Sequence, residues 1–187
     1  ISSRGIGLSS DLVHHCAVEK IPVTFFDHHG SPYAVLQNPT HAMSSLSVLQ
    51  VKIHATEKAL ELTKGILMGK SRNQMNLLKF YLRHRKKTDP GYAEKTSANL
   101  EAMEKTLDEL QNIAWEDDYA KIRERLMLLE ARISTYYWDC VKDLLPDELG
   151  FAKRDRHGAR DLVNMLLNYG YGFLYQRLWN AVTKAGL

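Results

Sequence analysis

The sequence predicts an α+β protein in which a small β-rich segment precedes a larger helical domain. Two β-branched and aromatic runs, at 22–26 and 33–36, flank a turn that contains Gly30, a pattern typical of a β-hairpin. From Leu46 onward, apolar residues recur at helical spacing. We therefore expect the remnant of an N-terminal β domain at 1–36, a linker at 37–45 and an α-helical domain at 46–187.

Start and stop signals set the expected bounds of the helices. The stretch Ser9-Ser10-Asp11 can cap a short helix over 12–17. A long helix is predicted over 46–82, and Asp89-Pro90-Gly91 breaks it because proline lacks a backbone N–H and clashes in a helix interior. Further helices are expected at 92–113, at 117–145 and, with Asp161 as the cap, at 161–185.

The composition is that of a globular chain, since 44% of the 187 residues are apolar and 25% are charged. Lys and Arg outnumber Asp and Glu by only 25 to 22, so the net charge alone predicts no polyanionic partner. The charges are segregated, however: 79–87 and 153–160 are strongly basic, whereas 101–118 is acidic. This segregation predicts local positive fields that the total charge conceals.

Three further features concern the cellular setting. No apolar run approaches the roughly 18 residues of a transmembrane helix, so we expect no membrane association. The two cysteines, Cys16 and Cys140, form no closely spaced pair, which favours a reduced protein of the cytoplasm. The chain has no initiator Met and stops at Leu187 without a helix-ending tail, so we expect that both ends are truncated.

Glu130 is the most informative residue of the third long helix. It lies four residues after Leu126 and three before Ile133, and therefore falls on or beside the apolar stripe. A carboxylate there is costly unless it is paired, hydrogen-bonded or bound to a metal. Periodicity alone leaves two interpretations open: an edge residue that pairs with an arginine, or a metal ligand.

Several stretches resemble one family in order and with compatible spacing. They are Gly5–Ser9, Ile21–Phe25, Lys70-Ser-Arg-Asn-Gln74, Leu129–Trp138, Phe151-Ala-Lys-Arg154 and the long segment Asp161–Tyr175. Together they resemble the CRISPR-associated endonuclease/integrase of the adaptation module, the "Cas one" family. The resemblance implies an α-helical catalytic domain that joins the 3′-hydroxyl ends of double-stranded DNA fragments into a CRISPR array. This transesterification is assisted by Mg²⁺ or Mn²⁺.

The resemblance also assigns residues and partners. Glu130 matches the family's glutamate metal ligand, whereas the His and Asp ligands are expected beyond Leu187, so we expect that this chain alone neither cleaves nor integrates DNA. A homodimer and the second adaptation protein ("Cas two") are the implied protein partners, in the prokaryotic cytoplasm. The residues that become candidate DNA-phosphate contacts are Arg83, Arg85, Lys86, Arg154, Arg156 and Arg160.

Alternatives remain open for residues and for function. Asn164 matches a family asparagine near the active site, where it could support the metal or face a phosphate, but an ordinary asparagine on a helix surface or in an interhelical hydrogen bond fits equally well. The basic tracts could be solvated helix ends. The whole protein could be a non-enzymatic DNA-binding or assembly scaffold, or an integrase of a related mobile element.

Overall fold

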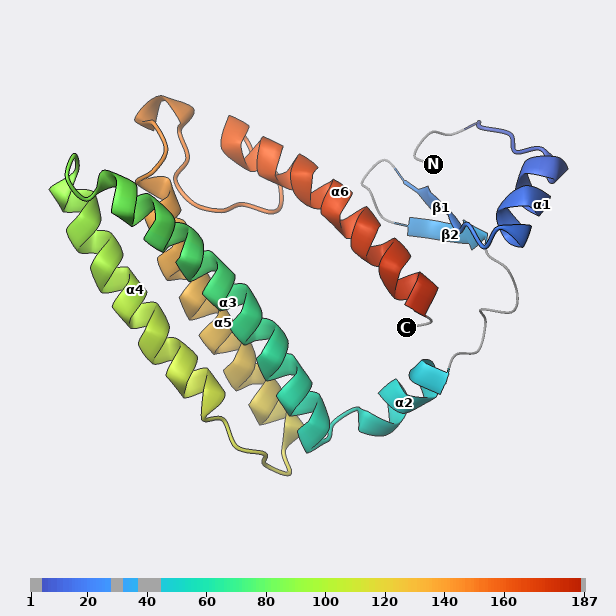
Figure 1. Ribbon diagram of the computed structural model, residues 1–187, viewed down its shortest axis with the longest axis horizontal. Coiled ribbons are helices and arrows are strands. Elements are labelled where there is room, and N and C mark those ends of the chain that lie inside the picture. The colour runs from blue at the N-terminus through green and yellow to red at the C-terminus, as the bar shows by residue number, and fades with distance from the viewer. Residues whose placement is uncertain (1–4, 28–31, 37–44, 186–187) are drawn as a thin grey trace. The chain divides into compact units, whose positions relative to one another are not determined.

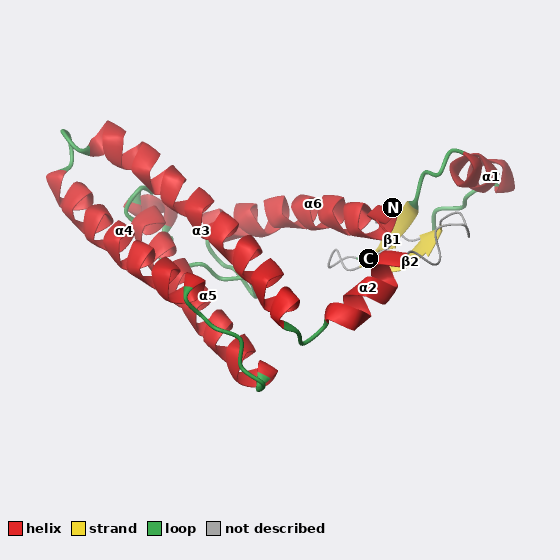
Figure 2. Ribbon diagram, turned by 60° about the horizontal axis from the view of Figure 1, so that its bottom comes forward, coloured by secondary structure: helices red, strands yellow, loops and turns green. Residues whose placement is uncertain are grey.

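The computed structural model describes residues 5–27, 32–36 and 45–185 (Figure 1). Within these residues the strands are confined to one hairpin and helices form most of the rest (Figure 2). The main feature of the α+β prediction is therefore confirmed. The α-helices and β-strands are α1 (Ser10–Val18), β1 (Val23–Phe26), β2 (Pro32–Leu36), α2 (Ser45–Ile53), α3 (Glu57–Arg85), α4 (Pro90–Gln111), α5 (Tyr119–Lys142) and α6 (Leu162–Ala185).

The chain divides into two compact units. One comprises residues 1–52 together with 166–187, and the other comprises residues 53–165. No local pattern in the sequence predicts that residues 166–187 group with the N-terminal segments. None of the helices in the described ranges is both long enough and apolar enough to cross a membrane.

The first unit contains α1 and the predicted hairpin. Ser9 caps α1, because its hydroxyl oxygen accepts a hydrogen bond of 3.2 Å from the backbone N–H of Leu12. Strands β1 and β2 pair in antiparallel register, with Val23 opposite Leu36. The predicted turn at 27–30 and linker at 37–45 fall mostly on residues 28–31 and 37–44, which lie outside the described residues.

The second unit is built on the three long helices α3, α4 and α5, which lie side by side in Figures 1 and 2. Helix α4 packs along both of the others. Apolar residues at helical spacing form two buried clusters between them. One cluster contains Met75, Leu78, Leu100, Met103, Leu107, Ile133 and Cys140, and the other contains Leu60, Leu110, Ile113, Ile122, Leu126 and Leu129. These clusters hold α3 and α5 in a fixed mutual register.

The prediction of one continuous helix over 46–82 is wrong, because the helix is interrupted between α2 and α3. Ala55 has a φ of 53°, in the left-handed region, which ends α2. The Thr56 hydroxyl donates a hydrogen bond of 2.6 Å to the Ile53 carbonyl and stabilises this turn. The predicted break at Asp89-Pro90 is confirmed, since Asp89 caps α4 by accepting a hydrogen bond from the Tyr92 N–H.

Candidate metal and DNA site

Glu130 lies on α5 at the edge of the buried stripe. Its neighbours Leu129 and Ile133 are buried, whereas the Glu130 side chain is 31% exposed. The Lys70 ammonium, from α3, donates a hydrogen bond to Oε1 of Glu130 and forms an ion pair with it. Glu130 thus has a basic partner across the α3–α5 interface, although this partner is a lysine and not the arginine considered from the sequence.

A recess of about 210 Å³ opens beside Glu130 on the same pair of helices. Its floor is apolar, and Glu130 and Arg123 supply the charged groups of its lining. The lining residues are Leu60, Thr63, Leu67, Tyr119, Arg123, Leu126, Met127 and Glu130. The carboxylate is therefore accessible from the recess rather than enclosed in the core.

Glu130 is the type of ligand that a hard divalent cation prefers, but one such ligand is too few to hold the ion. Carboxylate oxygens are the protein ligands that Mg²⁺ prefers, and the side chain of Glu130 is accessible. However, the described residues contain no group of three or more His, Cys, Asp or Glu side chains that could hold a metal ion. One oxygen of Glu130 is also bonded to Lys70. The described residues thus supply one ligand and not a complete metal site.

Asn164, only 1% exposed, organises the segment that joins α5 to α6. Its amide oxygen accepts hydrogen bonds from the Arg154 guanidinium (3.0 Å) and the Asp155 N–H (2.9 Å). Its amide nitrogen donates to the Lys153 carbonyl (2.8 Å) and to the Asp161 carboxylate (2.8 Å). Because an asparagine amide has two donors and two acceptor positions, protein partners use the full capacity of this side chain.

Asp161 completes this cluster and caps α6, as predicted. Its carboxylate accepts a hydrogen bond of 2.8 Å from the backbone N–H of Asn164. The side-chain and backbone hydrogen bonds from Asn164 lower the pKa of Asp161 below its ordinary value. Asn164 in this structure fixes the loop and the start of α6. Any influence of Asn164 on DNA binding is therefore indirect, through the residues that it holds in place.

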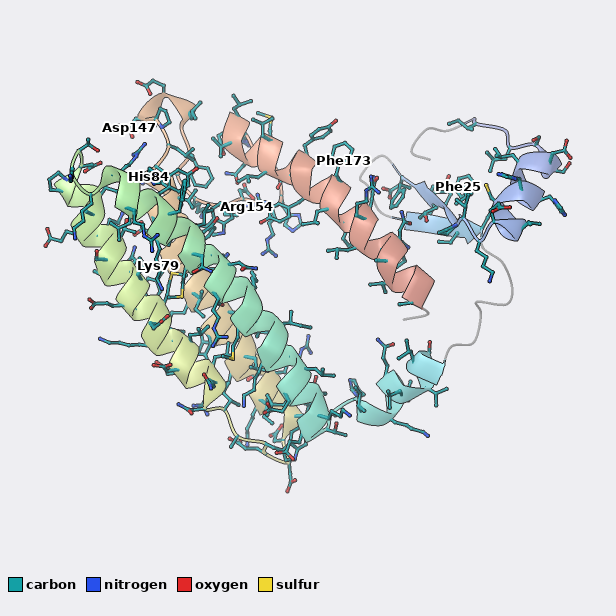
Figure 3. All side chains as sticks on the ribbon, viewed as in Figure 1. Phe25, Lys79, His84, Asp147, Arg154 and Phe173 are labelled. Atoms are coloured by element: carbon teal, nitrogen blue, oxygen red, sulfur yellow. The ribbon has the colours of Figure 1, made fainter. Side chains whose placement is uncertain are left out.

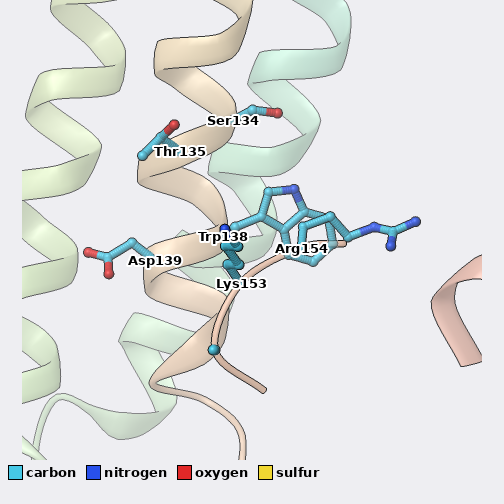
Figure 4. A pocket seen from close by; sticks show the side chains of 7 residues that line it. Ser134, Thr135, Trp138, Asp139, Lys153 and Arg154 are labelled. Carbon is cyan, nitrogen blue, oxygen red and sulfur yellow. The ribbon is translucent and has the colours of Figure 1, made fainter. Parts of the chain in front are cut away.

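Arg154 belongs to the same cluster and also borders a second recess. Its guanidinium lies over the Trp138 ring at 5.9 Å from the ring centroid, which is cation–π geometry. Figure 3 labels Arg154 on the segment between α5 and α6, and Figure 4 shows it beside Trp138. The second recess has a volume of about 330 Å³ and is lined by Ser134, Thr135, Trp138, Asp139, Ala152, Lys153 and Arg154 (Figure 4).

Asp139, the acidic residue of this recess, already has partners. The Lys95 ammonium of α4 bridges Asp139 (3.1 Å) and Asp143 (2.7 Å), and the hydrogen bond to Asp143 raises the pKa of Lys95. The Asn99 amide also donates a hydrogen bond to Asp139. Asp139 thus shares one lysine with Asp143, and Lys153 and Arg154 are the positively charged residues of the recess lining.

The structure separates the candidate phosphate contacts into two kinds. The guanidinium groups of Arg85 and Arg154 have protein partners; that of Arg85 donates to the carbonyls of Asp143 (3.4 Å) and Leu144 (3.3 Å) at the end of α5. The other four candidates are exposed: Arg83, Lys86, Arg156 and Arg160. Contact with DNA stays a prediction for all six.

Lys70 is the residue at this site to which the sequence analysis assigned no role. It belongs to the stretch Lys70–Gln74 that resembles the family, but nothing in its spacing places it opposite Glu130. The pairing depends on the register between α3 and α5, which only the packed core determines.

Comparison with known proteins identifies the family. The family model described as "CRISPR associated protein Cas1" matches residues 1–187. A CRISPR-associated endonuclease Cas1 from Archaeoglobus fulgidus is 30% identical over 186 residues, which cover 96% of this chain and 54% of the relative. Another from Saccharolobus solfataricus is 32% identical over 182 residues, covering 96% of this chain and 47% of the relative.

Solved structures agree at the level of the fold. A Cas1 protein from Thermotoga maritima superposes with a TM-score of 0.66 at 18% identity, over 97% of this chain and 52% of that chain. A chain of a partial Cas6-RT-Cas1–Cas2 complex also gives a TM-score of 0.66, at 22% identity and the same coverage.

The helical fold and the sequence relatives together define a CRISPR-associated protein. More specifically, the chain belongs to the Cas1 family, which confirms the resemblance found in the sequence. The chain spans about half the length of the curated relatives that it matches first.

Proposed function

We propose that this chain forms part of a metal-dependent DNA endonuclease/integrase that inserts new spacer DNA into a CRISPR array during antiviral adaptation. Membership of a family whose curated relatives are named endonucleases supports the reaction class. The observation that carries the residue assignment is the accessible Glu130 carboxylate, held on α5 beside a recess. The proposed cofactor is Mg²⁺ or Mn²⁺, which suits a carboxylate oxygen ligand and polarises a phosphodiester.

The proposed site is completed in the whole protein. Because the described residues supply one ligand, the proposal requires the His and Asp ligands that the family resemblance places beyond Leu187. The chain of 187 residues alone is then expected to be inactive. The proposed partners are double-stranded DNA, a second copy of the protein and Cas2, and the proposed location is the prokaryotic cytoplasm. The likeness to a chain solved in a complex with Cas2 motivates that partner.

The proposed DNA surface uses the exposed basic residues. Arg156 and Arg160 are exposed on the segment whose backbone the Asn164 cluster fixes, and Arg83 and Lys86 are exposed at the end of α3. Guanidinium and ammonium groups that have water as their neighbours can exchange it for phosphate oxygens. Arg85 and Arg154 are proposed to act mainly by holding these segments in place.

An integration assay on the whole protein with Cas2 tests the enzymatic proposal. Glu130→Gln keeps the size of the side chain but removes the charge, and we expect integration to fall at least about 100-fold because a metal ligand is lost. Glu124→Gln is the matched control, since Glu124 is an exposed glutamate on the same helix. Wild-type rates for the Glu130 variant would contradict the proposal.

The scaffold alternative is separated by a second arm of this experiment. A protein that only binds DNA would keep its function in Glu130→Gln but lose affinity when Arg156 and Arg160 are both changed to Glu. Lys105→Glu, an exposed site within the acidic part of α4, is the control for charge reversal. A mobile-element integrase would catalyse the same chemistry. The presence or absence of a repeat-spacer array beside the gene distinguishes it from a CRISPR integrase.

A further inference from the structure

The contact between Lys70 and Glu130 joins two positions that the core holds facing each other. Lys70 precedes Ser71, which is buried on α3, and Glu130 follows Leu129, which is buried on α5. The backbones of both charged residues are therefore fixed by their neighbours, while their side chains reach the surface and are 42% and 31% exposed. The pair is thus built into the helix register but remains open to solvent.

We propose that Lys70 is a displaceable counter-ion that competes with a divalent cation for the carboxylate of Glu130. The ammonium already occupies the place beside Oε1 where the proposed function would put a metal ion. The inference rests on the proposed function, because it takes Glu130 as a metal ligand. It adds that the Lys70 ammonium opposes cation binding at Glu130.

Competition follows from the size and charge of the two cations. A Mg²⁺ ion lies about 2 Å from a carboxylate oxygen, and a charge-assisted ammonium hydrogen bond is about 2.8 Å long. Lys70 bonds to Oε1, and a divalent cation on either oxygen of Glu130 would lie close to the ammonium, so the two positive charges repel each other. Lysine can leave because its ammonium is carried on a flexible four-carbon stem, and the exposed side chain of Lys70 has water beside it to receive the charge.

The recess beside Glu130 contains a positively charged side chain of its own. Arg123 lines the same recess from α5, seven residues before Glu130. No ion pair joins Arg123 to Glu130 among the described residues, whereas Lys70 bonds directly to Oε1. Lys70 is therefore the group with which a cation competes most directly, and Arg123 contributes only to the general field of the recess.

The consequence is a threshold for metal loading. A lone carboxylate with a lysine partner holds a divalent cation weakly, so tight binding of the ion requires the binding energy of further ligands. Lys70 in this way stabilises the metal-free site by neutralising Glu130, and it makes occupancy depend on the completed ligand set.

Paramagnetic broadening by Mn²⁺ in NMR spectra of the 187-residue chain tests the inference, because this method detects weak binding without any catalytic assay. We expect Lys70→Met to broaden amide signals around Glu130 at about fivefold lower Mn²⁺ concentration than the wild type, the change that loss of an exposed ion pair allows. Lys79→Met, at an exposed lysine on the same helix that Figure 3 labels, is the control and should match the wild type.

The double variant Lys70→Met with Glu130→Gln distinguishes the two ways of failing. Broadening that depends on Glu130 but needs the same Mn²⁺ concentration with and without Lys70 would overturn the counter-ion inference and leave the proposed function standing. Broadening in Lys70→Met that survives the loss of the Glu130 carboxylate would overturn both, because Glu130 would not be the ligand. Lys70→Gln provides a polar replacement if the methionine variant does not fold.

Discussion

Two polar clusters of the unit formed by residues 53–165 differ in how completely they are bonded. Asn164 is buried, and protein partners occupy both its donors and both its acceptor positions. The Glu130–Lys70 pair is instead about one-third exposed and opens onto a recess. A cluster whose hydrogen bonds are all satisfied internally can stabilise a fold, but it has no capacity left for a ligand.

The two clusters therefore differ in role: one stabilises the fold and the other is accessible to a ligand. The family resemblance makes both Glu130 and Asn164 candidate site residues. The Glu130 carboxylate is accessible to a ligand, whereas the Asn164 amide is bonded to protein groups. Arg85 and Arg154 fall with Asn164, because their guanidinium groups bond to the protein. If this division is correct, mutations in the two clusters will differ in their effect on the free energy of unfolding.

The largest effect on stability is expected at Asn164. Asn164→Ala removes the partner of the Asp155 N–H and of the Lys153 carbonyl and one hydrogen bond of the Arg154 guanidinium, so we expect a loss of about 2–4 kcal/mol in the free energy of unfolding. Urea denaturation followed by circular dichroism measures it. Asn76→Ala, at an exposed position of α3, should change stability by less than about 0.5 kcal/mol. A similarly small loss at Asn164 would break the comparison.

A smaller, pH-dependent effect is expected at Asp161. Its pKa is lowered in the folded protein by the hydrogen bonds from Asn164, so the ionised carboxylate stabilises the fold above the pKa of the unfolded chain. This contribution is lost as the pH falls through the folded pKa. The stability difference between wild type and Asp161→Asn should therefore be largest near neutral pH and shrink below about pH 4.

Urea titrations of both proteins at several pH values give this difference directly. Other groups with lowered pKa values, such as Asp118, are common to both proteins and cancel. A difference that stays constant down to acid pH would mean that the charge of Asp161 contributes nothing to the Asn164 cluster.

Local sequence signals predicted most of the fold. Ser9 and Asp161 cap helices as expected, and the predicted break at Asp89-Pro90 is present, because these signals depend on neighbouring residues alone. The break between α2 and α3 was missed since Ala55 takes a left-handed conformation that is usual for glycine and rare for alanine. Neither Gly nor Pro marks that position.

The candidate site was predictable only in part, for the same physical reason. Helical periodicity placed Glu130 at the edge of the buried stripe, which the structure bears out. Its partner Lys70 is 60 residues away in the chain, and the partners of the Asn164 side chain are two backbone groups and two side chains of an irregular loop. Such contacts depend on helix register and loop path, which a single sequence does not encode as a local pattern.

The smallest effect on stability is expected at the Glu130–Lys70 pair. Exposed ion pairs contribute about 0.2–1 kcal/mol, because water screens the charges and ordering two long side chains costs entropy. Lys70→Met and Glu130→Gln should therefore each change the free energy of unfolding by no more than about 1 kcal/mol, with a coupling of similar size in the double-mutant cycle. A loss above about 2 kcal/mol on removing Lys70 would assign the pair to the structural class, since a surface contact kept open for a ligand cannot stabilise the fold that strongly.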